Sequence, residues 1–267
     1  MLGSILSNIL LVLGCCFFVG GLRYQEQSFN TTVASTMSSL LTIASASLII
    51  PSALSATLHS MSRTDPDAGP SREVLFLSHG TSIILLGVYV MYLYFQLKSH
   101  AQLFEETAEE HVDAEVQGEN ADEEEHLLGP GGATVVLVII TLLVAVCADY
   151  LVGSIDSIVQ KTGMSKTFIG LVLIPIVGNA AEHVTAVMVA WKNKMDLAIG
   201  VAVGSSLQIA LFVTPFLVVL GWIMHVPMTL DFHTFETVTF FIAGLVVTYL
   251  IQDGKSNYLE GGLCLGM

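Results

Sequence analysis

The sequence predicts an all-α polytopic membrane protein. Of its 267 residues, 53% are hydrophobic and only 12% are charged, and the mean hydropathy is +0.74. A soluble domain is typically about 45–50% apolar and about 25% charged. The apolar residues also form continuous runs of about 20, long enough to cross a bilayer as helices. A membrane barrel would show alternation instead.

We expect about seven complete transmembrane helices and the start of an eighth. The apolar runs cover approximately residues 2–20, 34–54, 74–97, 133–153, 167–190, 196–222 and 233–251, and a last run begins near Tyr258. The chain is divided into a first part at 1–97, a polar connection at 98–132 and a second part at 133–267. The cysteines, expected to be small buried side chains, are Cys15, Cys16, Cys147 and Cys264.

The net charge of −14 belongs mostly to the polar connection. Eleven acids and no Lys or Arg lie between Glu105 and Glu125, so the rest of the chain carries only −3. This segment is either a solvated, partly disordered linker or an acidic helix along the membrane surface that gathers cations. The acids that we assign to such a regulatory segment are Glu105, Glu106, Glu109, Glu110, Asp113 and Glu115. Because basic residues are few, nucleic-acid binding is not expected. Counted by side, five bases against four weakly favour a cytosolic acidic segment.

The run at 167–190 predicts a broken helix. Pro175 and Gly178 lie in its middle, and proline removes a backbone donor and clashes with the preceding turn. Irregular backbone at membrane depth is tolerated only beside a cavity or inside protein. We therefore expect free carbonyl groups next to a polar site.

Polar side chains follow this break directly. Asn179, Glu182 and His183 have the three- and four-residue spacing that places side chains on one helix face. A carboxylate, an amide and free carbonyls suit a hard cation such as Ca²⁺, and no Cys or second His at ligand spacing favours Zn²⁺. A structural role for Glu182 is the alternative. His183 is equally suited to packing and to proton handling.

The next run carries the same kind of signal. Ser205 and Gln208 are three apart in the motif GSSLQ, where they can line a cation path or bond between helices. The segment Gly3–Ser7 resembles Gly204–Gln208 at an offset of 201 residues. Interrupted polar segments in two halves of a chain indicate an inverted-repeat transporter.

Four segments together resemble the calcium/cation exchanger family, in particular the fungal vacuolar calcium/proton exchangers. They are GSILSNILLVLG (3–14), SKTFIGLVLIPIVGNAAEHVTAV (165–187), GSSLQIALFVTPFLVVLGW (204–222) and MTLDFHTFET (228–237). The resemblance implies an inverted-repeat cation exchanger fold that exchanges Ca²⁺ for H⁺, with Mn²⁺ as a further candidate substrate and no cofactor. It also implies a multi-pass protein of the vacuolar membrane, and a cytosolic acidic segment that takes part in cation regulation. The residues that it implies around the cation are Glu182, Asn179, Ser205, Gln208, Ser4, Ser7 and Asn8, with Glu182 and His183 in proton coupling.

The chain departs from the family pattern in one respect. It carries the acidic motif GNAAEH once, whereas the family pattern has such a motif in each repeat. We therefore expect a fragment, with the first motif roughly 20–30 residues before Gly3 and the last helix incomplete, as the spacing of Gly178 and Gly204 suggests. The alternatives are a non-transporting subunit or regulatory fragment with a cation-binding acidic loop, and an exchanger for Mn²⁺ or monovalent cations. No phosphate-binding glycine loop is present, so neither ATP hydrolysis nor another enzyme activity is expected. The sequence carries no signal for an oligomeric state.

Overall fold

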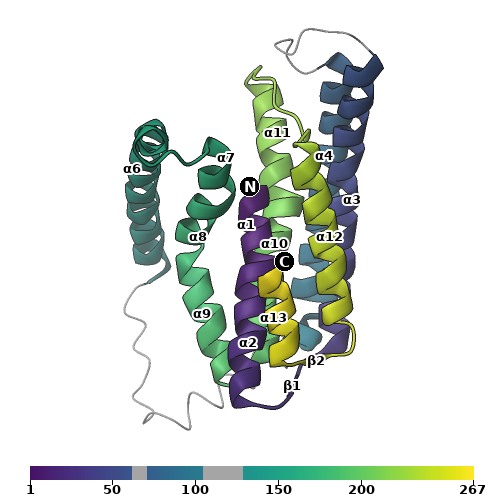
Figure 1. Cartoon of the computed structure of the whole chain (residues 1–267), viewed down its shortest axis with the longest axis vertical. Coiled ribbons are helices and arrows are strands. Elements are labelled where there is room, and N and C mark those ends of the chain that lie inside the picture. Colours follow the sequence, from purple (N-terminus) through teal and green to yellow (C-terminus); the bar gives the residue numbers. More distant parts are fainter. Residues whose placement is uncertain (62–70, 105–128) are drawn as a thin grey trace.

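The protein folds into a bundle of long helices with one short pair of strands (Figure 1). The computed structural model describes residues 1–61, 71–104 and 129–267. The acidic segment from Glu105 to Glu125, with the regulatory role predicted for it, lies outside the described residues.

The first part of the chain contributes three long helical stretches. The first is continuous but contains a π-helical turn, and the third ends in one. In order, the elements are α1 (Leu2–Leu6), η1 (Ser7–Val12), α2 (Leu13–Arg23), β1 (Gln27–Ser28), α3 (Thr31–Met61), α4 (Arg72–Tyr94) and η2 (Phe95–Ser99).

The second part contributes a long isolated helix, a broken span and further bundle helices. In order, the elements are α6 (Pro130–Thr162), α7 (Lys166–Phe168), η3 (Ile169–Leu173), α8 (Ile174–Gly178), α9 (Ala180–Trp191), α10 (Met195–Gln208), η4 (Ile209–Val213), α11 (Thr214–Ile223), α12 (Thr234–Leu250), β2 (Lys255–Ser256) and α13 (Tyr258–Gly266).

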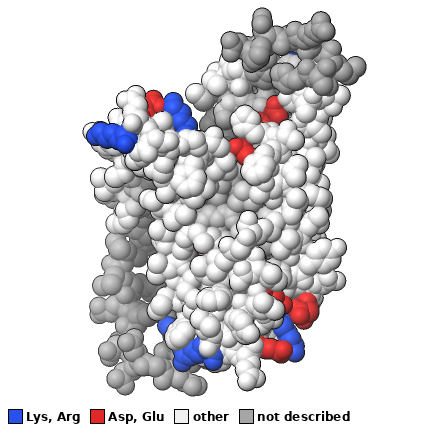
Figure 2. Space-filling view, in the orientation of Figure 1, with Lys and Arg blue, Asp and Glu red and all other residues white. Residues whose placement is uncertain are grey.

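The predicted apolar runs all form helices. Within the described residues, five helices are long and apolar enough to cross a membrane, and the bent pair Lys166–Gly178 and Ala180–Trp191 makes a sixth candidate span. The seventh run forms α12, a shorter apolar helix of 17 residues, and the eighth forms α13, with 9 residues. Figure 2 shows the charged side chains of one face gathered at the two ends of the molecule, with an uncharged band between them. Such a band is expected where the surface meets lipid.

The core lies where the first helix meets the helices of the second part. Ile5, Ile9 and Leu13 are fully buried, and the stretch that carries them contacts α9, α10 and α13. Helix α1 contacts η4, and α2 contacts α10, which comes before η4 in the chain. The stretch α1–α2 and the stretch α10–α11 therefore run antiparallel. This arrangement places segments about 200 residues apart against each other at mid-bundle.

The pairing of α3 with α12 uses hydroxyl groups. Thr42 and Thr248 lie 3.4 Å apart through their Oγ1 atoms, and Thr237 donates to Ser52. Small and hydroxyl side chains let membrane helices approach closely and form hydrogen bonds with each other. Such contacts matter in a bilayer, because apolar side chains pack against lipid about as favourably as against a neighbouring helix.

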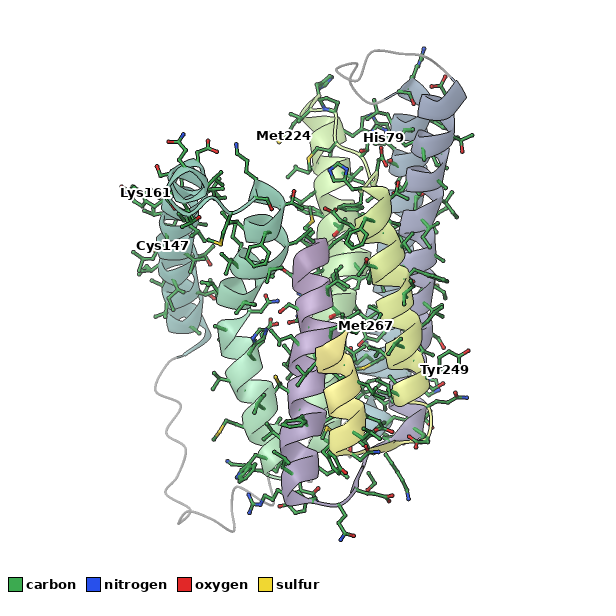
Figure 3. All side chains as sticks on the ribbon, viewed as in Figure 1. His79, Cys147, Lys161, Met224, Tyr249 and Met267 are labelled. Carbon is green, nitrogen blue, oxygen red and sulfur yellow. The ribbon has the colours of Figure 1, made fainter. Side chains whose placement is uncertain are left out.

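Helix α6 stands apart from the rest of the bundle (Figure 1). Its most apolar window has a mean hydropathy of 2.8, yet none of that window is buried. One ion pair joins its end to α7, between Asp156 and Lys166. The expectation that Cys147 is buried is wrong, because this residue lies on α6 (Figure 3) and is exposed. The predicted burial is confirmed for Cys16 and Cys264, and Cys15 is half-buried.

Candidate functional site

The broken span is confirmed at the position that the sequence predicts. Helices α8 and α9 are bent by 57° at the single residue Asn179. Pro175 has no N–H to offer to the carbonyl of Leu171, four residues earlier, and the π-helical turn η3 ends just before it. The Leu171 carbonyl instead lies against Gly3, where a Cβ atom would collide with it. Glycine at position 3 therefore permits the close approach of α1 to the broken span.

Asn8 is the centre of the polar network beside the break. This side chain is fully buried. Its Nδ2 atom donates to Glu182 Oε2 at 3.2 Å and to Ser205 Oγ at 2.8 Å. Its Oδ1 atom accepts from Asn179 Nδ2 at 3.0 Å. One amide thus connects η1, α9 and α10 at the same level of the bundle.

A second contact extends the network by one residue on each helix. Ser7 Oγ and His183 Nε2 lie 3.2 Å apart, so His183 faces η1 like its neighbour Glu182. This contact allows both roles that the sequence left open, hydrogen bonding and proton handling. Asn179 also donates to the Ser4 carbonyl oxygen at 3.3 Å, which brings Ser4 to the site through its backbone.

Gln208 lies away from this network. It is exposed and, with Ser205, lines a groove of about 450 Å³ between α10 and the helices α3 and α4. The small residues Gly200 and Gly204 lie on the same wall, and a Cβ at either of them would meet open space. Ser205 therefore belongs both to the Asn8 network and to the lining of this groove, which can admit further side chains.

The charge at the site comes from Glu182. It lies in the first turn of α9 and is half-buried. Among the described residues, no group of three or more His, Cys, Asp and Glu side chains could hold a metal ion. The available oxygens are those of one carboxylate, two amides and two hydroxyls, together with backbone carbonyls. This set suits Ca²⁺ better than a metal that prefers nitrogen or sulfur.

The predicted internal repeat has a structural counterpart. The π-helical turns η1 and η4 end at Val12 and Val213, which are 201 residues apart, the same offset as that of the matching serine motifs. Neither of these stretches is broken, so the interruption expected from sequence takes the form of a π-helical turn in both. Single π-helical turns are frequent at functional sites.

Sequence reasoning missed the residues that hold the far end of α9. Gln27 and Arg23 bond to backbone carbonyl groups there, and the N–H of Asn30 donates to Asp196 at the start of α10. Pattern reasoning assigned these polar residues to connections. No local pattern marks these contacts, because Arg23, Gln27 and Asn30 lie among other polar residues between two apolar runs.

A helical membrane protein with a polar site at a broken span is the class that this fold and site define. The chain belongs to the sodium/calcium exchanger protein family, whose model matches residues 1–98 and 132–267. This result confirms the resemblance seen in the sequence.

Individual relatives are similar over nearly the whole chain. The vacuolar calcium ion transporter of Schizosaccharomyces pombe is 48% identical over 262 residues, which cover 98% of this chain and 60% of that protein. The Ca²⁺/H⁺ antiporter of Aphanothece halophytica is 41% identical over 271 residues, covering 98% of this chain and 69% of the relative. The crystal structure of the selenium-substituted Ca²⁺/H⁺ antiporter YfkE matches with a TM-score of 0.75 and 36% identity, over 99% of this chain and 71% of that one. The chain therefore spans about three fifths of the length of its fungal relative.

Proposed function

We propose that this protein is a secondary transporter that exchanges Ca²⁺ for H⁺ across the vacuolar membrane and so sequesters calcium. Family membership supports the transporter class. The names of the relatives from Schizosaccharomyces pombe and Aphanothece halophytica support the vacuole, the calcium ion and the proton. The division at residues 98–132 and the cytosolic placement of the acidic segment belong to the same proposal.

One observation carries the proposal: Glu182 is held at a break in a membrane span by an amide that also holds Ser205 and Asn179. A carboxylate at membrane depth is costly and needs a reason. An array of oxygens from three helical segments supplies the kind of ligands that Ca²⁺ takes. We assign Glu182, Asn179, Asn8, Ser7, Ser4 and Ser205 to this cation site, and Gln208 to the groove that adjoins it at Ser205.

Competition at Glu182 couples the two ions. Its carboxylate can hold a proton or coordinate Ca²⁺, and the two states exclude each other. A proton gradient then drives Ca²⁺ in the opposite direction without a separate energy source. We assign the relay of the proton to His183, and its contact with Ser7 at the edge of the network supports this role.

A second carboxylate would complete the charge balance for a divalent ion. Glu182 supplies one negative charge, and the groove beside Ser205 and Gln208 can admit further side chains. We propose that a partner supplies an acidic side chain that reaches the site through this groove. These 267 residues alone are then expected to transport poorly.

The test is Ca²⁺ uptake driven by a pH gradient into vesicles that contain the reconstituted chain. Any uptake that the chain shows should disappear on Glu182→Gln. It should survive Glu73→Gln, which changes an exposed acid at the start of α4. Uptake that is indifferent to Glu182→Gln would refute the site. Strong uptake by the chain alone would refute the need for a second carboxylate.

Two further candidates are separated by the same experiment. The single carboxylate at the site favours a non-transporting subunit or regulatory fragment. Such a protein would bind Ca²⁺ but show no uptake, even when the partner that supplies the second acid is present. An exchanger of the same family for Mn²⁺ or monovalent cations would load those ions in place of Ca²⁺ when they are offered one at a time. Oxygen ligands alone separate Ca²⁺ from Mn²⁺ weakly.

A further inference from the structure

The connection between α2 and α3 reaches across the bundle to the carboxyl end of α9. Gln27, in β1, is only 1% exposed. Its Nε2 atom donates to the Ala190 carbonyl oxygen and to Asn193 Oδ1, both at 2.9 Å. Arg23 adds a bond to the Trp191 carbonyl oxygen at 3.2 Å and places its guanidinium group over the indole ring. The end of α2 and the loop after it thus bond through side chains to carbonyl groups in the last turn of α9, where the Ala190 oxygen also accepts from the Asn193 N–H at 3.1 Å.

The backbone on both sides is shaped for this contact. Asn193 has a left-handed backbone with φ of 64°, which turns the chain after α9 and presents its Oδ1 atom to Gln27. On the other side, a Cβ at Gly20 would collide with Gln27 Oε1. That oxygen is buried and has no hydrogen-bond partner among the described residues. The side chain of Gln27 is therefore fixed by its two donated bonds and by the close surface of Gly20.

These contacts act on the helix that carries Glu182. Eight residues separate Glu182 from Ala190, which is about 12 Å along a helix axis. Ala186 and Ala190 are fully buried, and α9 packs against α2 along this length. The opposite end of α9 is held by Asn179, through Ser4 and Asn8. Both ends of α9 are consequently bound to one stretch of chain, from Ser4 to Gln27, with Glu182 between the two points.

We infer that Gln27 is a positioning residue that sets the location of the Glu182 carboxylate within the cation site. Gln27 lies beside the carboxyl end of α9 and acts on Glu182 through that helix. The inference rests on the proposed function, because it gives Gln27 a role in cation affinity. Groups hydrogen-bonded directly to a metal ligand change metal affinity about 10- to 100-fold when they are removed. Gln27 bonds to the helix that carries the ligand and not to the ligand itself, so its effect should lie at the low end of that range.

The test is equilibrium Ca²⁺ binding to the full 267-residue chain in lipid nanodiscs, counting only the binding that Glu182→Gln abolishes. Gln27→Met keeps the length of the side chain but removes both donors, and it should raise the dissociation constant about tenfold. Gln25→Met is the matched control, because Gln25 is exposed in the same loop, and it should leave binding unchanged. The temperature of unfolding, measured for each variant, shows whether the protein is folded.

A second pair of variants keeps the inference testable if Gln27→Met does not fold. Asn193→Gly preserves the left-handed turn and removes the acceptor, so it should weaken binding. Asn193→Asp keeps the acceptor and should bind Ca²⁺ as the wild type does. If Asn193→Asp binds Ca²⁺ as the wild type does and Asn193→Gly does not, the loss comes from the missing acceptor and not from a general loss of stability.

A distance measurement reads the position of α9 directly. Spin labels at Leu22 and Val184, which are 64% and 65% exposed, report the separation of α2 and α9 in a background without the native cysteines. Gln27→Met should broaden or shift this distance, and Gln25→Met should not.

The outcomes separate the two levels of the proposal. Absence of Glu182-dependent Ca²⁺ binding in the wild-type chain would overturn the proposed function and this inference with it. Binding that is present but unchanged in folded Gln27→Met and Asn193→Gly would overturn the inference alone. Equal losses in the Gln25→Met control would overturn it as well.

Discussion

Replacing Asn8 with alanine is expected to weaken Ca²⁺ binding at Glu182 about tenfold. The substitution removes the one side chain that contacts Glu182, Ser205 and Asn179 together. Without it the carboxylate loses its donor and is no longer held toward the oxygens of the neighbouring helices. Alanine fits the space, because it only removes atoms from a fully buried position.

The magnitude follows from the bond to the charged group. A hydrogen bond to a charged partner contributes about 1.5–3 kcal/mol, and the lower value applies here because Glu182 is half-buried. The other two partners keep alternative bonds, Ser205 to the Val201 carbonyl and Asn179 to the Ser4 carbonyl, so they add little. About 1.5 kcal/mol corresponds to about a tenfold change in a dissociation constant.

The assay is the same nanodisc binding measurement, arranged as a double-mutant cycle. Asn8→Ala is compared with the wild type, and Asn8→Ala with Glu182→Gln is compared with Glu182→Gln alone. If Asn8 acts through Glu182, the substitution should have no further effect in the Glu182→Gln background. Ser7→Ala, which removes only the contact with His183, should change Ca²⁺ affinity less.

Unchanged or tighter Ca²⁺ binding by a folded Asn8→Ala variant would refute this reasoning. It would mean that the amide restrains Glu182 without helping it to meet the cation. An equal loss in both Glu182 backgrounds would also refute it, because the effect would then come from the general packing of η1.

Three other predictions concern the same region. Lowering the pH should raise the dissociation constant for Ca²⁺, because protons compete with the cation for the Glu182 carboxylate; affinity that does not change with pH would contradict the coupling. Asn8→Asp removes the same donor as Asn8→Ala but adds a second carboxylate, so it should bind Ca²⁺ more tightly than Asn8→Ala does, which calcium titrations of the two purified variants measure; equal or weaker binding by Asn8→Asp would count against the charge argument. Gly3→Ala should lower the free energy of unfolding by about 1–3 kcal/mol, as overpacking does, because its Cβ would meet the Leu171 carbonyl; Gly170→Ala, where a Cβ meets open space, is the control in the same unfolding experiment.

Much of the fold follows from local properties of the sequence. Apolar runs predict helices because membrane depth leaves the backbone few other ways to satisfy its polar groups. Pro175 and Gly178 predict the break, since proline cannot donate its part of the helical ladder. The three- and four-residue spacing of Asn179, Glu182 and His183 predicts a shared face, and in the structure all three contact η1.

Other features depend on neighbours that no local pattern reveals. Ser4 reaches the site through its backbone carbonyl, and Gln208 faces a groove instead of the Asn8 network. Cys147 is exposed because α6 stands apart, although its surroundings in sequence are as apolar as those of Cys16. Gln27 is polar and lies in a connection, so its burial against α9 is visible only once the bundle is assembled.

The break at Asn179 also determines the electric field at the site. A helix carries a partial positive charge at its amino end and a partial negative charge at its carboxyl end. In an unbroken span these charges would lie at the two membrane surfaces. Here the carboxyl end of α8 and the amino end of α9 meet inside the span. Glu182, in the first turn of α9, lies where a negative charge is favoured, and the carbonyl groups ending α8 attract a cation from the other side of the break. A bound cation therefore meets attraction from one half-helix and repulsion from the other, which moderates its affinity. The proposed exchange needs this moderation, because a cation that is bound too tightly is released slowly.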